Sequence, residues 1–207
     1  MTIKDTDLLL VIDVQNDFCP GGALAVEDGD SVVPVINTLI GRFTNVVLTQ
    51  DWHPAGHSSF ASSHQGQSPF GTIEMPYGQQ TLWPDHCIQG STGAELHSDL
   101  ITDPSSLIVR KGMNPAIDSY SAFFENDHST STGLAGYLRD RNIQRVICTG
   151  LAFDFCVFYS AQDAVKEQFE TVVVTDACRA IDMEGSAQSA QDAMTANGVS
   201  LVTSAQL

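Results

Sequence analysis

The chain has 207 residues, of which 43% are hydrophobic and 16% charged, a composition typical of one globular domain with a substantial buried core. Its formal net charge of −16, from 25 acidic and 9 basic residues, argues against binding to nucleic acid or to an anionic membrane surface, which requires clustered Lys and Arg. We therefore expect a neutral or cationic small molecule as the partner.

The cysteines and the N-terminal region predict a cytoplasmic protein. The five cysteines form no C-x-x-C pair, and their odd number suits reduced thiols better than a disulfide framework. The first apolar run, 8–12, is too short for the core of a signal peptide, and no stretch reaches the length of a membrane span. The sequence leaves open whether the protein is a monomer or a homo-oligomer.

Short apolar runs alternate with segments of helical periodicity along the chain. The expected strands are 7–14, 45–50, 106–111, 145–150, 171–176 and 199–203. The runs are continuously apolar, as in parallel strands that helices cover on both faces. The expected helices are 30–43, 129–142, 156–169 and 183–198.

Two of the expected helices carry clear local signals. The helix in 30–43 begins at Asp30 or Ser31, with Pro34 in its first turn. Its expected buried face consists of Val32, Val35, Ile36, Leu39 and Ile40. The helix in 183–198 ends on Asn197-Gly198 as a C-cap. The alternation of strands and helices predicts one α/β domain over 1–207, a doubly wound sheet of about six mainly parallel strands with helices on both faces.

The stretch 51–105 interrupts this alternation. It is rich in His, Ser, Gly, Pro and aromatic residues, and a loop of this length inside a domain is usually functional. We predict a long loop that carries metal-binding and substrate-binding groups.

Three chemically active side chains follow expected strands. Asp13 and Lys111 end two of the apolar runs, and a turn at Gly150 leads from another run to Cys156. Because ligands bind at the carboxyl ends of parallel strands, we expect all three side chains at one edge of the sheet. Each of them, taken alone, has an ordinary structural explanation, such as a cap, a solvated cation or a packed thiol. Their convergence favours a catalytic site.

The three side chains have complementary chemistry. Lys111 and the N-terminus of a helix beginning near Asp154 are expected to lower the pKa of the Cys156 thiol. Asp13 can accept the thiol proton and deliver it to a leaving amine. Backbone N–H groups at the turn, those of Ala152 and Cys156, are the candidate oxyanion hole.

A second group of side chains predicts a metal site. Asp51 and His53 follow a strand with the i, i+2 spacing that points both side chains to one side of an extended segment. His86 is the best candidate for a third ligand. One carboxylate and two imidazoles suit zinc, iron or manganese. The sequence leaves open whether His57 or Ser59 contacts the metal directly or through water.

Five segments resemble one known family in their order along the chain. They are "DVQNDFCPGGAL" (13–24), "DWHPAGHSSFAS" (51–62), "LWPDHCIQGSTGAELH" (82–97), "RKGMNPAIDSYSAFFEND" (110–127) and "GLAFDFCVFYSAQDA" (150–164). The chain resembles the nicotinamidases (pyrazinamidases) of the isochorismatase-like cysteine hydrolase superfamily. The resemblance implies an isochorismatase-like fold, a Cys156–Asp13–Lys111 triad and hydrolysis of nicotinamide to nicotinate and ammonia, as in NAD salvage, through a Cys thioester.

The resemblance also implies the roles of groups around the triad. A divalent metal, with zinc as the first expectation, would be held by Asp51, His53 and His86 and would bind the pyridine nitrogen. The aromatic residues that match the family's ring pocket are Phe18, Trp83 and Tyr120. A cis peptide bond is expected at Leu151–Ala152. The chain departs from the family pattern at Phe153 and Phe155, which stand where Thr and Tyr are common.

Three other functions remain as alternatives. An amidase for carbamoyl or ureido substrates would have no ring nitrogen to place on a metal. An isochorismatase would not require a nucleophilic cysteine. A catalytically inactive metal-binding protein would bind metal without deamidation.

Overall fold

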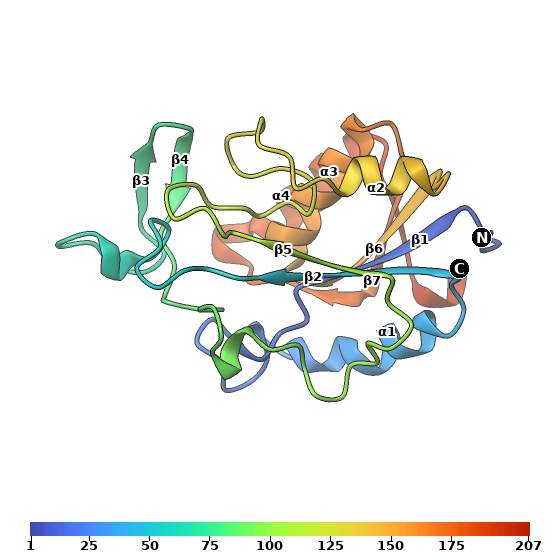
Figure 1. Ribbon diagram of the computed structural model, residues 1–207, viewed down its shortest axis with the longest axis horizontal. Coiled ribbons are helices and arrows are strands. Elements are labelled where there is room, and N and C mark those ends of the chain that lie inside the picture. The colour runs from blue at the N-terminus through green and yellow to red at the C-terminus, as the bar shows by residue number, and fades with distance from the viewer.

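Six parallel strands form the central sheet of the computed structural model, which describes residues 1–207 (Figure 1). The strands are β1 (Asp7–Ile12), β2 (Asn45–Asp51), β5 (Leu107–Lys111), β6 (Arg145–Leu151), β7 (Glu170–Arg179) and β8 (Ser200–Val202). Their order is β5-β2-β1-β6-β7-β8, and every neighbouring pair is parallel. All six expected strands are present, and the predicted fold class is confirmed.

Helices cover both faces of the sheet. Helix α1 (Val32–Ile40) lies on one face, and α2 (Leu134–Asp140), α3 (Phe158–Lys166) and α4 (Ser186–Ala196) lie on the other (Figure 1). Each α-helix is shorter than the sequence predicted, because part of the expected span forms other structure, such as the 3-10 turn Met183–Gly185 before α4. None of the helices has the length and apolarity that a membrane span needs.

The continuous apolar runs are explained by two cores, one on each side of the sheet. In β1, Leu9 and Val11 pack with the buried residues of α1. The alternate residues Leu8, Leu10 and Ile12 pack in the second core, which includes residues of α2, α3 and α4. A strand between two helical layers has no solvent-facing side, so it shows no polar alternation.

Two predictions about helices have different outcomes. Four of the five residues expected on the buried face of α1 are buried, while Val35 is only partly buried and Val33 is buried in addition. The C-cap of α4 is confirmed, since Asn197 follows the last helical residue and Gly198 has a φ of +85°.

The stretch 51–105 is more ordered than the predicted long loop. It contains an antiparallel hairpin, β3 (Thr72–Met75) and β4 (Gly78–Thr81), in which Met75 pairs with Gly78 across the turn at Pro76 and Tyr77. Exposed and partly buried residues alternate in Thr72–Met75, but a strand of four residues is too short for this alternation to stand out in the sequence. The hairpin stands beyond the carboxyl ends of the strands (Figure 1).

The sheet topology fixes the place of the site. The chain passes from β1 to β2 on one side, while β6 pairs with β1 on the other. Crevices at such switch points, outside the carboxyl ends of the strands, bind ligands in open α/β sheets. The candidate site lies there.

Candidate active site

The structure brings Asp13, Lys111 and Cys156 together in one buried cluster. The ammonium of Lys111 lies 2.7 Å from Asp13 Oδ2 and 3.4 Å from Cys156 Sγ. It also donates a hydrogen bond to the Ser119 carbonyl oxygen at 3.0 Å and pairs with Asp51. Lys111 therefore bridges the thiol and the two carboxylates.

One oxygen of the Asp13 carboxylate is held by a hydrogen bond from a threonine, and the other is left to exchange a proton. The Thr49 hydroxyl donates to Asp13 Oδ1 at 2.6 Å, and the Asp13 N–H donates to the same hydroxyl at 3.1 Å. Asp13 Oδ2 is buried and accepts no hydrogen bond besides its ion pair with Lys111. A carboxylate oxygen of Asp13 and the thiol sulfur lie within 4.8 Å of each other. This arrangement suits proton transfer from the thiol to Asp13.

The segment from β6 to α3 positions the thiol. Gly150 lies inside β6, not in a turn as predicted, and it has a φ of +111°. A Cβ there would overlap the Ile12 carbonyl oxygen of the neighbouring strand. The expected cis peptide bond at Leu151–Ala152 is present. Ala152 and Cys156 both line the pocket, as candidate oxyanion-hole residues should.

The helix after the nucleophile differs from the prediction. Residues Phe153–Val157 form one π-helical turn, and the α-helix begins only at Phe158. In this turn the Phe155 and Val157 N–H groups both donate to the Ala152 carbonyl, at 3.1 Å each. Single π-helical turns are frequent at functional sites.

Burial dominates the ionisation of the three groups. Desolvation raises the pKa of the Cys156 thiol well above its usual range, although Lys111 opposes this shift. Desolvation also raises the pKa of Asp13 to about 6, against the lowering effect of Lys111. Burial alone would lower the pKa of Lys111, but Asp13 and Asp51 hold it well above its usual range. The expectation of a lowered thiol pKa is wrong, because burial raises the pKa of Cys156 and the negative charges of Asp13 and Asp51 raise it further, which together outweigh the opposing effect of Lys111.

Asp51, His53 and His86 form a candidate metal site. Asp51 Oδ2 lies 3.8 Å from His53 Nε2 and 3.7 Å from His86 Nε2, and all three side chains are buried. Burial alone would raise the pKa of Asp51, but Lys111 and the two histidines hold it well below its usual range. The sequence-predicted ligands therefore face one another with the carboxylate charged.

Backbone carbonyls fix the orientation of both imidazoles. His53 Nδ1 donates to the Gly112 carbonyl at 3.1 Å, and His86 Nδ1 donates to the Pro84 carbonyl at 2.8 Å. Each Nε2 is thereby left as a lone-pair donor toward Asp51, which is the arrangement of metal-bound histidines. Glycine is required at 112, where φ is +68° and a Cβ would overlap the His53 ring.

His57 and Ser59 lie behind the candidate metal site. His57 Nδ1 accepts from the Ser59 N–H at 3.1 Å and lies 2.8 Å from the Ser59 hydroxyl, and His57 Nε2 donates to the Asn114 carbonyl at 2.7 Å. Both ring nitrogens are thus engaged. The His57 ring centroid is 4.5 Å from that of His53, so His57 supports the ligand from the side.

Asp118 is a site residue that the sequence reading missed. Its carboxylate is buried, lines the pocket and lies 3.9 Å from His53 Nε2. The i, i+2 spacing of Asp118 and Tyr120 in an extended segment was the available signal, and it is the same spacing that identified Asp51 and His53.

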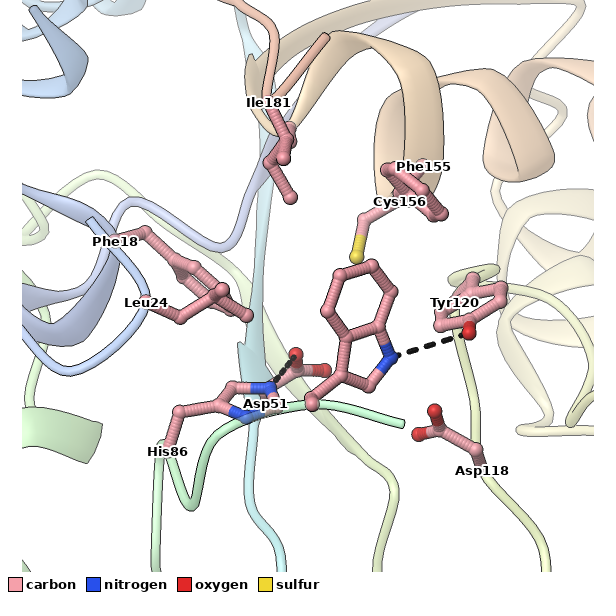
Figure 2. Close-up of a pocket in the computed structure, with 11 residues that line it drawn as sticks. Phe18, Leu24, Asp51, His86, Asp118, Tyr120, Phe155, Cys156 and Ile181 are labelled. Carbon is pink, nitrogen blue, oxygen red and sulfur yellow. Dashed lines mark hydrogen bonds and ion pairs between the residues drawn. The ribbon is translucent and has the colours of Figure 1, made fainter. Parts of the chain in front are cut away.

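An aromatic pocket joins the thiol to the metal-ligand group. Figure 2 shows Cys156 Sγ and the Asp51–His86 pair directed into one space, with Asp118 at its edge. Phe18, Trp83 and Tyr120, the three predicted ring-binding residues, all line it, and the other lining residues are Leu24, Ala152, Phe155 and Ile181. Leu24 and Ile181 were not predicted, since short apolar side chains in loops carry no functional signal.

The two phenylalanines near the nucleophile have separate roles. Phe155 lines the pocket, with its ring centroid 4.9 Å from that of Trp83 in an edge-to-face arrangement. Phe153 is buried in the second core. Phe155 is therefore part of the pocket wall and Phe153 is a packing residue.

The site defines a class of protein. A buried thiol beside an ammonium and a carboxylate, at the carboxyl edge of a doubly wound sheet, is an arrangement that suits a hydrolase with a cysteine nucleophile. The model of the isochorismatase domain matches residues 7–206. The chain therefore belongs to the isochorismatase family.

Characterised relatives extend over nearly the whole chain. A nicotinamidase from Acinetobacter baylyi is 54% identical over 196 residues, which cover 95% of this chain and 92% of the relative. The solved structure of a nicotinamidase/pyrazinamidase from Acinetobacter baumanii has a TM-score of 0.98 and 53% identity, and covers 99% of both chains. A pyrazinamidase from Pyrococcus horikoshii, solved in complex with zinc, has a TM-score of 0.77 and 34% identity, and covers 96% of this chain and 99% of its own.

Proposed function

We propose that this chain is a nicotinamidase, a hydrolase that converts nicotinamide to nicotinate and ammonia. The observation that carries the proposal is one aromatic-walled pocket with a buried thiol on one side and a carboxylate and two imidazoles on the other. A flat ring with a carboxamide and a nitrogen atom meets both groups at once. The similarity to nicotinamidases along almost the whole chain supports the same substrate.

A divalent metal fits the donor set of Asp51, His53 and His86. Each histidine has its Nδ1–H bound to a backbone carbonyl, so its Nε2 is prepared to coordinate. One carboxylate and two imidazoles, with positions left for other ligands, suit zinc, and the zinc complex of the Pyrococcus horikoshii pyrazinamidase supports this choice. When bound, the metal would act as a Lewis acid toward the ring nitrogen and would orient the ring.

The first step is acylation of Cys156. Asp13 Oδ2 takes the thiol proton, and the sulfur attacks the carboxamide carbon to form a C–S bond. The N–H groups of Ala152 and Cys156 stabilise the negative charge on the carboxamide oxygen. The C–N bond then breaks, Asp13 returns its proton to the nitrogen, and ammonia leaves a thioester on Cys156.

The second step releases nicotinate. A water molecule gives a proton to Asp13 and adds its oxygen to the thioester carbon, after which the C–S bond breaks. Asp13 returns the proton to sulfur, so the neutral thiol that burial favours is restored. Lys111 stays protonated throughout, because its pKa is held well above its usual range by Asp13 and Asp51 after burial has acted to lower it.

The same geometry extends to pyrazinamide. Pyrazinamide has a ring nitrogen in the same relation to the carboxamide as nicotinamide, so it meets the same two groups. We place the reaction in NAD salvage and the protein in the cytoplasm, in agreement with its five free cysteines.

The test is ammonia release from nicotinamide by the metal-loaded protein, compared with N-carbamoyl substrates. We expect turnover of nicotinamide and none of the carbamoyl compounds. Cys156→Ala should lower kcat by about 10⁴-fold or more while the protein keeps its fold and its metal content. Turnover of the carbamoyl compounds alone, or ample activity in the Cys156→Ala variant, would sink the proposal.

A further inference from the structure

Gln80, in β4 of the hairpin, is a fully buried polar side chain outside the groups described so far. Its amide nitrogen lies 2.8 Å from Asp118 Oδ2, 2.9 Å from Tyr120 Oη and 2.7 Å from the Thr81 carbonyl oxygen. A buried amide with this many polar neighbours serves a network. Two members of that network, Asp118 and Tyr120, line the substrate pocket.

The partners of Gln80 decide which way its amide points. The Oε1 atom accepts from the Asn126 side-chain amide and from the Tyr77 hydroxyl, both at 3.2 Å. The opposite end faces the Asp118 carboxylate, which can only accept. The NH₂ group must therefore be directed to Asp118, and its bond to that charged acceptor is the strongest it makes.

Gln80 and the backbone together fix both oxygens of Asp118. The Ser119 N–H donates to Oδ1 and the Gln80 amide donates to Oδ2, each at 2.8 Å. Oδ1 also lies 3.9 Å from His53 Nε2, the nitrogen that is free to coordinate. The carboxylate is thereby held at the edge of the metal-ligand group. Figure 2 shows the Asp118 side chain at the edge of the space that Asp51 and His86 face.

Asp118 changes the charge balance of the site. Asp13 and Asp51 are both paired with the single ammonium of Lys111, which leaves one negative charge uncompensated. The Asp118 carboxylate has no cationic side chain paired with it other than His53, which is charged only when protonated. Its charge brings the uncompensated total to two, which matches a divalent cation.

We propose that Gln80 is a positioning residue of the metal site, which acts by holding the Asp118 carboxylate beside His53. The proposal rests on the proposed function only in that it takes the Asp51–His53–His86 group as the metal site. The hairpin β3–β4 is then an integral part of the metal-binding apparatus, since it delivers the side chain that fixes the second negative charge.

The experiment measures zinc affinity of the metal-free protein by competition with a chromophoric chelator. Gln80→Met keeps the size of the side chain and removes both donors, and Asp118→Asn removes the charge. Each variant should weaken zinc binding by about 10-fold or more, as is usual when a group that orients a metal site is lost. In the double variant the loss should equal that of Asp118→Asn alone, because Gln80 acts through Asp118.

The matched control is Gln79→Met, the same change at the exposed neighbour in β4. It should keep wild-type zinc affinity, and thermal melting of the metal-free proteins separates a folding defect from a binding defect.

Wild-type zinc affinity in Asp118→Asn would overturn the proposal whatever the folding of the Gln80 variants. A Gln80→Met effect that persists in full in the Asp118→Asn background would overturn it too. Because the readout is zinc binding without substrate, it does not depend on which amide the enzyme hydrolyses. Nicotinamide turnover by the wild-type protein, measured separately, tests the proposed function alone.

Discussion

The strand ends and the stretch 51–105 contribute to one pocket but hold their side chains by different means. At the strand ends, sheet register does the positioning, since Asp51 and Lys111 are direct partners in the pairing of β2 with β5. In 51–105, both histidines of the metal-ligand group are held by hydrogen bonds to loop carbonyls, that of His86 to Pro84 and that of His53 to Gly112. The acid–base and nucleophilic chemistry thus rests on the carboxyl edge of the sheet, whereas the metal-ligand group of Asp51, His53 and His86 lies within 51–105.

Gln15 connects the two regions. Its side-chain amide donates to the Asp51 carbonyl at 2.8 Å and to the Ala94 carbonyl at 2.9 Å, and its oxygen accepts from the Asp51 N–H at 2.8 Å. One buried side chain just after β1 therefore ties the end of β2 to the inserted stretch. Substitutions in each region test this difference between them.

Replacement of Lys111 should have the largest effect, because it breaks the strand-end cluster. Lys111→Met leaves two buried carboxylates without their cation, so we expect the free energy of unfolding to fall by about 3–5 kcal/mol and kcat by about 10³-fold or more. Urea denaturation and nicotinamide turnover check this. The control Lys166→Met removes an exposed lysine paired with Asp163 at 2.9 Å and should cost less than about 1 kcal/mol. Equal losses in the two variants would contradict the assigned role.

Loss of a ligand from the inserted stretch should separate binding from folding. His86→Ala should weaken zinc affinity by more than about 100-fold, beyond what loss of an orienting partner costs. The thermal stability of the metal-free protein should change far less than in Lys111→Met, because the sheet is untouched. Chelator competition and melting curves measure the two effects. Wild-type zinc affinity would exclude His86 as a ligand.

The pH dependence should report Asp13 at the strand end. Burial raises the pKa of Asp13 to about 6, and the carboxylate must be ionised to take the thiol proton. We therefore expect kcat/KM to fall about tenfold per pH unit below this value. Thr49→Val removes a hydrogen bond that favours the ionised form, so the acid limb should move to higher pH.

The matched control for that shift is Thr149→Val. Thr149 is a buried threonine in β6 whose hydroxyl donates to the Leu10 carbonyl at 3.3 Å and not to Asp13. In Thr149→Val, the fall of kcat/KM at low pH should occur at the same pH as in the wild-type protein. A shift of the same size in both variants would mean that the limb does not report Asp13.

The smallest effect is expected at the pocket wall. Phe155→Tyr adds one hydroxyl to a ring that packs edge-to-face on Trp83 and is only partly buried. We expect kcat/KM for nicotinamide to change by less than about threefold, because aromatic packing is retained. Steady-state kinetics measure it. A change above tenfold would show that the hydroxyl takes part in recognition.

Local pattern was enough to predict the sheet and much of the site. Continuous apolar runs identified all six strands, and the rule that ligands bind at carboxyl ends of parallel strands placed Asp13, Lys111 and Cys156 together. The spacing of Asp51 and His53 likewise identified two of the metal-site residues, and the resemblance to a family supplied the aromatic pocket.

Tertiary structure decided what depends on contacts between distant segments. Whether Cys156 is a thiol or a thiolate depends on burial set against one ammonium shared by Asp13 and Asp51, and no local spacing shows that balance. Gln80 and Asp118 meet across 38 positions of sequence, from a hairpin too short to stand out by its pattern. The tendency to form a strand depends on residues that are neighbours in the sequence. The electrostatic environment of a side chain and its hydrogen-bond partners are set by distant residues that meet only when the chain folds.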